Sequence, residues 1–81
     1  MKIDYKPLEE QLRKIYFISI TGHVKTWFTR RVVGWYARPT GHASVPHTIN
    51  RLGLEIEKHD LPLIVDCDPV NRNRIKILFK V

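Results

Sequence analysis

Residues 16–37 read YFISITGHVKTWFTRRVVGWYA, and the structure of this stretch decides the fold. Five apolar residues in it recur at a period near that of a helix: Val24, Trp27, Phe28, Val32 and Trp35. The stretch is also rich in β-branched and aromatic residues, which favour strands, and Gly22-His23 can turn a hairpin between residues 16–20 and 24–28. We adopt the helix, over residues 23–37, and keep the hairpin as the alternative.

Two further helices are expected, one on each side of this stretch. Residues 7–18 begin with Pro7, which suits a first helical turn, and they carry one apolar stripe. Residues 44–59 begin with Ser44, a good N-cap, and Val45, Ile49, Leu52 and Ile56 form a second stripe. Gly53 leaves open whether this last helix ends there or near His59.

The C-terminal part predicts a β-hairpin. Residues 63–65 form a strand core, residues 68–73 have the Asp, Pro and Asn content of a turn, and residues 74–81 begin with basic and apolar residues in alternation. Length and pattern together predict an α+β fold over residues 1–81: one small three-helix domain with a C-terminal hairpin.

The positive charge is concentrated in the middle of the chain. The 81 residues carry a formal net charge of +6, and residues 11–54 contain seven Lys and Arg but no Asp or Glu. Because no neighbouring carboxylate neutralises these bases, their potential extends outward and favours a nucleic-acid partner.

The order helix, helix, turn, helix, hairpin resembles the winged helix-turn-helix DNA-binding domains over residues 8–81. In that family the helix after the turn enters the major groove and the hairpin is the wing. The resemblance implies a sequence-specific binder of double-stranded DNA, either a transcriptional regulator or a recombination accessory factor. It places recognition on residues 44–59 and the wing at residues 68–74.

The expected contacts divide into two groups. The side chains expected to read base edges lie away from the apolar stripe of residues 44–59: His47, Thr48, Asn50 and Arg51. Those expected to contact the DNA backbone or minor groove are Lys25, Arg30, Arg31, Arg38, Arg72, Asn73 and Arg74. The alternative is that both groups are only the solvated surface of the domain.

Catalytic, metal and cofactor sites are not expected. The four histidines and Cys67 fit no standard zinc spacing, and Cys67 stands between Asp66 and Asp68, an unfavourable place for a nucleophilic thiolate. Asp66 and Asp68 share a strand face but have no third ligand nearby in the sequence. Phosphate-loop and G-x-S-x-G signatures are absent from the sequence.

Several other functions stay open. We expect both tryptophans to anchor the core, although one exposed tryptophan would suit a partner or single-stranded nucleic acid. The main alternative is a protein-interaction module, such as an inhibitor of host machinery, or contact with a second copy of the chain. A small nuclease using His42 or His47 as base and an interfacial membrane helix over residues 23–37 are further options. A single cysteine and the lack of a signal-peptide pattern predict a cytoplasmic protein, nucleoid-associated if the source is bacterial or a phage.

Overall fold

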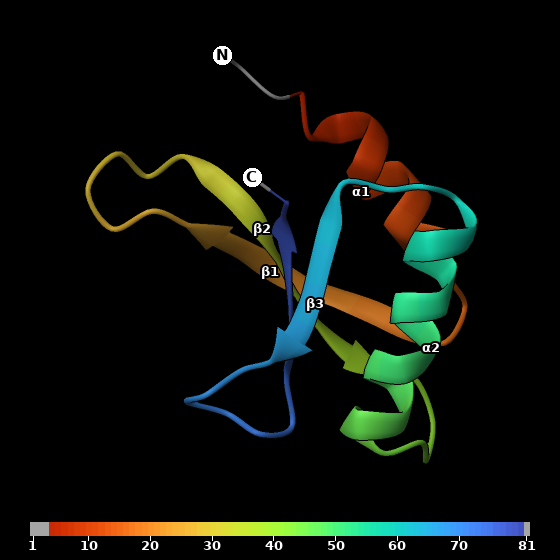
Figure 1. Cartoon of the computed structure of the whole chain (residues 1–81). Coiled ribbons are helices and arrows are strands. Elements are labelled where there is room, and N and C mark those ends of the chain that lie inside the picture. The colour runs from red at the N-terminus through yellow and green to blue at the C-terminus, as the bar shows by residue number, and fades with distance from the viewer. Residues whose placement is uncertain (1–3, 81) are drawn as a thin grey trace.

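The computed structural model describes residues 4–80, which form two helices and four strands (Figure 1). In chain order the elements are α1 (Lys6–Arg13), β1 (Ile18–Lys25), β2 (Val32–Pro39), α2 (Val45–Lys58), β3 (Leu63–Cys67) and β4 (Ile75–Phe79). The strands form one antiparallel sheet in the order β1-β2-β4-β3, so β4 lies between β2 and β3. The domain is α+β as expected, but the three-helix arrangement is wrong.

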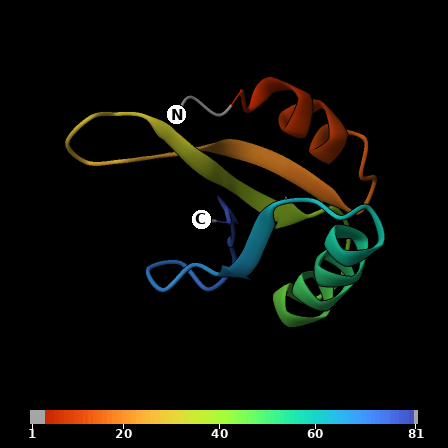
Figure 2. The same cartoon turned by 45° about the horizontal axis from the view of Figure 1, so that its top comes forward.

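Both helices cover the same face of the sheet (Figures 1 and 2), and the core fills the space between these two layers. Six core residues have no exposed surface: Leu12 of α1, Leu52 of α2, Trp35 and Ala37 of β2, and Ile75 and Ile77 of β4. Successive strand residues point to opposite faces, so the residues between these strand positions belong to the other face. In the described residues that other face carries no helix, and we call it the open face.

The structure corrects the interpretation of residues 23–37, which form parts of β1 and β2 and the turn between them. The alternative hairpin is also misplaced, because Gly22 and His23 lie inside β1 and the turn falls at residues 26–31. Gly34 gives the physical reason. A Cβ there would lie 2.0 Å from the backbone oxygen of Ile77 on β4, so the close approach of β2 and β4 requires glycine.

The first expected helix is confirmed as α1, although it ends at Arg13. Its Glu9 reaches the sheet, where Oε1 accepts a hydrogen bond from Trp35 Nε1 at 3.0 Å and lies 2.6 Å from His23 Nε2. Burial alone would raise the pKa of Glu9. Hydrogen bonds to Trp35 and His23 and the charges of His23 and Arg13 outweigh that effect, so the pKa falls below its ordinary value of 4.5.

The expected third helix is confirmed as α2, and the end point near His59 is the correct one. The Ser44 side chain caps the helix by accepting a hydrogen bond from the backbone N–H of His47 at 3.3 Å. Leu52 is fully buried, and Val45, Ile49 and Ile56 pack at the edge of the same core. The apolar stripe of this helix is therefore a core stripe.

The C-terminal hairpin is confirmed as β3 and β4. Its loop is held by Asp68, a buried residue whose carboxylate accepts hydrogen bonds from the backbone N–H of Val70 at 3.0 Å and from Arg74 Nε at 2.6 Å. The Val70 N–H is the largest influence on the pKa of Asp68. Together with Arg74 it outweighs the effect of burial and lowers that pKa.

One further expectation concerns the order of the elements along the chain. The order of elements behind the winged helix-turn-helix resemblance is not the order found in residues 4–80, where β1 and β2 stand in place of the second helix. Neither α1 nor α2 has the length and hydropathy of a segment that crosses a bilayer.

Candidate nucleic-acid interface

The β1–β2 hairpin extends beyond the two helices as a free arm (Figures 1 and 2). The strands pair from Ile18↔Pro39 to Lys25↔Val32, with register shifts after Ile20 and Val24. We call residues 25–31 at the end of this arm the hairpin tip. The tip is mostly the turn between β1 and β2 and projects clear of both helices (Figures 1 and 2), so it is open to a large ligand.

The backbone of the tip is held by its own polar groups. Thr26 N–H donates to the carbonyl of Arg31 at 2.9 Å, and Arg30 N–H donates to the carbonyl of Thr26 at 3.0 Å. The hydroxyls of Thr26 and Thr29 bond to each other, and Thr26 Oγ1 also accepts from Arg31 N–H at 3.2 Å. Arg30 closes the turn with a positive φ of 55°, a conformation that side chains rarely adopt. The turn is thus defined without any apolar packing.

Two aromatic side chains of the tip are left in solvent. Trp27 is 93% exposed and Phe28 is 87% exposed, and their ring centroids lie 6.4 Å apart with an angle of 35° between the planes. Fully burying one such side chain is worth about 1.5–3 kcal/mol. A ligand that covers both rings would therefore gain considerable binding energy.

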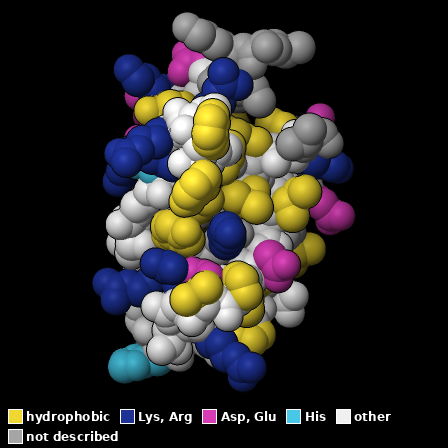
Figure 3. Space-filling model, turned by 90° about the vertical axis from the view of Figure 1, so that its left-hand side faces the viewer, with side chains coloured by type: hydrophobic (Ala, Val, Ile, Leu, Met, Phe, Trp, Pro, Cys, Tyr) yellow, Lys and Arg dark blue, Asp and Glu magenta, His cyan; other side chains and the backbone are white. Residues whose placement is uncertain are grey.

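The tip also carries three exposed cations. Lys25, Arg30 and Arg31 surround the aromatic pair, and none of them forms a salt bridge to an acid among residues 4–80. Seen from the side toward which the arm points, hydrophobic side chains form a column with Lys and Arg beside it and at its centre, and Asp and Glu lie next to the central cation (Figure 3). This surface therefore offers two features that suit nucleic-acid binding: apolar area that bases can contact and cations that phosphates can contact.

The open face of the sheet continues from the base of the arm. The register places Tyr36 beside Lys76, which in turn pairs with Asp66 of β3. The guanidinium of Arg74 stacks on the Tyr36 ring, 3.9 Å from its centroid. In the next row Leu78 lies between Gly34 and the half-exposed Ile64 of β3. The open face is thus apolar in one row and charged in the other.

The residues expected to read bases are distributed differently. On α2, His47 and Asn50 are exposed, whereas Thr48 is buried and its hydroxyl donates to the Ser44 carbonyl at 2.9 Å. Arg51 packs over the Phe17 ring at 4.0 Å and donates to the Tyr16 hydroxyl at 2.9 Å. Half of this group is therefore engaged within the protein.

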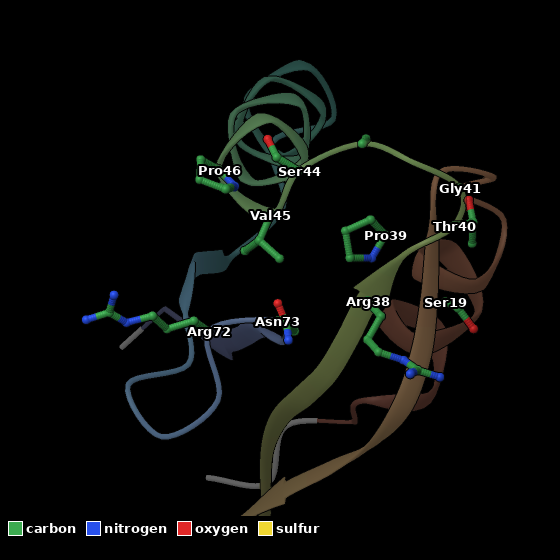
Figure 4. A pocket seen from close by; sticks show the side chains of 11 residues that line it. Ser19, Arg38, Pro39, Thr40, Gly41, Ser44, Val45, Pro46, Arg72 and Asn73 are labelled. Atoms are coloured by element: carbon green, nitrogen blue, oxygen red, sulfur yellow. The ribbon is translucent and has the colours of Figure 1, made fainter.

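The residues expected at the DNA backbone fall into separate places. Arg38, Arg72 and Asn73 line a hollow of about 610 Å³ beside the start of α2. The two guanidinium groups extend in opposite directions, away from the hollow (Figure 4). Pro46 has no N–H, and the His47 N–H donates to Ser44, so the start of α2 offers few donors to an anion. Arg74 pairs with Asp68.

The structure brings together residues that sequence reasoning separated. Lys25, Arg30 and Arg31 were expected as phosphate contacts. Trp27 was expected in the core, with one exposed tryptophan as the alternative, and Phe28 in the same apolar stripe. No local signal separated a helix from a hairpin here, because Trp27 and Phe28 lie three and four positions after Val24 and so share one face of a helix. Lys76 was missed because its position depends on pairing between β2 and β4.

Metal-ligating and reactive groups are scattered. Among residues 4–80 no three His, Cys, Asp or Glu side chains gather closely enough to hold a metal ion, and Cys67 is an exposed free thiol. The hairpin tip therefore remains the best-defined candidate site. No family model, curated protein or solved structure matches this chain in the comparisons with known proteins.

Proposed function

We propose that the protein binds nucleic acid and that the hairpin tip is its principal contact. One observation carries the proposal: Trp27 and Phe28 stand almost fully exposed between Lys25, Arg30 and Arg31 at the end of a projecting arm. Lys and Arg neutralise phosphates and release their counterions, which supplies affinity that does not depend on sequence. The formal net charge of +6 supports long-range attraction to the same polyanion.

The arm suits this role better than α2. The exposed residues near the C-terminal end of α2 include Glu57 as well as Lys58, and His59 lies 3.3 Å from Glu55. That end of α2 therefore carries both signs of charge. All charged residues of the hairpin tip are cations. A two-stranded ribbon is also narrow enough to enter a major groove. In this proposal His47 and Asn50 serve as secondary contacts at most.

A salt series tests the proposal. Binding of a labelled duplex and a labelled single strand is measured by fluorescence anisotropy between low and moderate salt. Arg30→Gly removes a charge while glycine adopts the positive φ of that position freely, so the turn is kept. Each phosphate that the variant no longer neutralises should lower the slope of log K against log salt by about 0.7–0.9. Arg31→Gln should act in the same way.

The matched control is Lys58→Gln, which removes one exposed cation at the end of α2, away from the tip. It should leave the salt slope nearly unchanged. Equal effects of Lys58→Gln and Arg30→Gly would show that net charge matters rather than the tip. No binding of wild type to either nucleic acid at low salt would refute the proposal.

A protein partner is the second candidate, and the exposed apolar surface favours it. Ile64 is 51% exposed on the open face, in addition to the two aromatic residues of the tip. Exposed apolar surface of this kind also marks protein interfaces. Affinity for a protein partner would fall strongly with Trp27→Ala but change little with salt, which separates the two functions.

A further inference from the structure

We infer that the nucleic acid taken by this protein is single-stranded, with unpaired bases stacked on Trp27 and Phe28 and phosphates held by Lys25, Arg30 and Arg31. This inference rests on the proposed function and specifies its substrate class. It concerns the same tip, but it requires base stacking on the aromatic rings in addition to phosphate contacts.

The first argument is the accessibility of the rings. Trp27 and Phe28 are exposed over nearly their whole surface, so their faces can stack with flat partners. Bases in a duplex already stack on one another, and separating a base step costs a few kcal/mol. Bases in a single strand present their faces directly, and every base has such a face. Stacking on this tip therefore favours a single strand of any sequence.

The second argument is the shape of the surface behind the tip. From the arm, the open face first presents the row Gly34–Leu78–Ile64 and then the row that holds Tyr36 and Lys76. Arg74 stacks on Tyr36 in that second row. Duplex DNA is stiff over about 150 base pairs, so it would touch the narrow tip without following this surface. A single strand is flexible enough to continue from the tip onto the open face.

The third argument is the charge along that path. Among the described residues, the register places one acid on the central rows of the open face, Asp66, and its carboxylate accepts a hydrogen bond from the backbone N–H of Cys67 at 2.7 Å. Asp68 lies in the β3–β4 loop and is already paired with Arg74. Lys76 and the three tip cations thus outnumber the acids that a phosphate chain would meet.

Duplex insertion is the competing geometry for the same rings. Proteins that wedge apolar side chains into a duplex recover the unstacking cost by wrapping bent DNA around further surface. Here the row of the open face next to the tip consists of Gly34, Leu78 and, on the edge strand, Ile64. That row has no charged residue to contact the phosphates of a bent duplex, whereas the bases of a single strand can lie on Leu78 and Ile64, so the single strand is favoured.

The experiment compares four labelled ligands of equal length by fluorescence anisotropy: oligo-dT, a blunt mixed-sequence duplex, single-stranded RNA and an abasic single strand. The abasic strand keeps the phosphates but has no bases to stack. Wild type should bind oligo-dT and RNA more tightly than the duplex and the abasic strand. Trp27→Ala should weaken oligo-dT binding by about 5- to 100-fold with no change in the salt slope.

Trp27→Phe is the matched variant, because it keeps an aromatic ring at the same exposed position. It should retain most of the oligo-dT affinity, and Phe28→Ala should weaken it as Trp27→Ala does. On the abasic strand all three variants should equal wild type. Each substitution lies in an exposed side chain, so thermal melting should confirm native folding.

The outcomes separate this inference from the proposed function. Equal affinity for oligo-dT, abasic strand and duplex, with no effect of Trp27→Ala, overturns the single-strand inference and leaves nucleic-acid binding intact. Tighter binding to duplex, abolished in Trp27→Ala, also overturns it and assigns a wedge role. No binding to any of the four ligands overturns both, and phosphatidylserine vesicles then test whether the tip inserts into an anionic membrane surface.

Discussion

The β1–β2 hairpin holds two tryptophans, one in the middle of β2 and one at the tip, and the two residues are used in opposite ways. In the middle of β2, opposite His23, Trp35 has no exposed surface. Its ring packs against Phe79 with centroids 5.2 Å apart, and its indole N–H donates to Glu9. At the tip, Trp27 is 93% exposed beside Phe28. The same residue type is thus a core anchor where the helices cover the hairpin and a free surface beyond them.

The difference follows from the lengths of α1 and of the hairpin strands, of which it contacts β1. The eight residues of α1 span about 12 Å, whereas the eight residues of each hairpin strand span about 27 Å. The helix therefore covers the base of the arm and leaves the tip bare. Two adjacent aromatic side chains beyond the covering layer form an exposed apolar patch, and such patches mark binding sites more often than single exposed residues do.

The largest expected effect on stability is at Trp35 in the core. Trp35→Ala should lower the free energy of unfolding by about 3–5 kcal/mol, because it removes the largest core side chain and the donor to Glu9. Urea denaturation followed by circular dichroism measures the change. Trp35→Phe should cost less, since a ring remains. A Trp35→Ala variant as stable as wild type would contradict the role of Trp35 as core anchor.

The next effect concerns the close contact between β2 and β4 at Gly34. Gly34→Ala should destabilise by about 1–3 kcal/mol or more, because its Cβ would lie 2.0 Å from the Ile77 carbonyl oxygen and the strands would have to separate. Gly22→Ala is the matched control on the same hairpin, where the nearest atom, in Tyr36, is 4.0 Å away. Thermal melting should distinguish the two variants, and equal melting temperatures would contradict the proposed strand contact.

A smaller effect depends on pH and on Glu9. The pKa of Glu9 is lower in the folded protein than its ordinary value of 4.5, so its carboxylate stabilises the fold above that pH. This contribution disappears as the pH falls through the lowered pKa. Glu9→Gln lacks it at every pH. The melting-temperature gap between wild type and Glu9→Gln should therefore narrow as the pH falls from about 5, and a constant gap would be evidence against the stabilising role of this carboxylate.

The smallest effect on stability is expected at the tip. Trp27→Ala should change the free energy of unfolding by less than about 0.5 kcal/mol, because the side chain has almost no packing to lose. The same urea titration used for Trp35→Ala provides the measurement. A destabilisation near that of Trp35→Ala would mean that the tip folds back onto the body in solution, which would remove the difference between the two tryptophans.

Local signals were sufficient where the chain interacts with itself over short distances. Ser44 predicted the start of α2 because a cap acts within one turn, and the apolar stripe around Leu52 predicted its buried face. The Asp, Pro and Asn residues after Cys67 predicted the C-terminal loop for the same reason. The cations of the hairpin tip were also expected, but only as isolated charges.

Local signals failed where partners lie far apart in the sequence. The apolar spacing of residues 23–37 fits a helix by itself, and nothing local indicates that Arg30 takes a positive φ or that Thr26 and Thr29 close a turn. Two of the expected base contacts were wrongly predicted to be free for the same reason. Thr48 faces the core, and Arg51 packs over Phe17, thirty-four positions earlier in the chain. These contacts depend on which surfaces the fold brings together.

The sequence by itself determined a small basic α+β domain, the helix after Ser44, the C-terminal hairpin and an acid-free central segment. These features depend on composition, or on contacts within a few residues. Only the tertiary structure decided that residues 23–37 form strands and that one tryptophan is buried while the other is exposed. The reason is that β2 is held between β1 and β4, the latter about forty residues later, and burial depends on how far the helical layer reaches over that sheet.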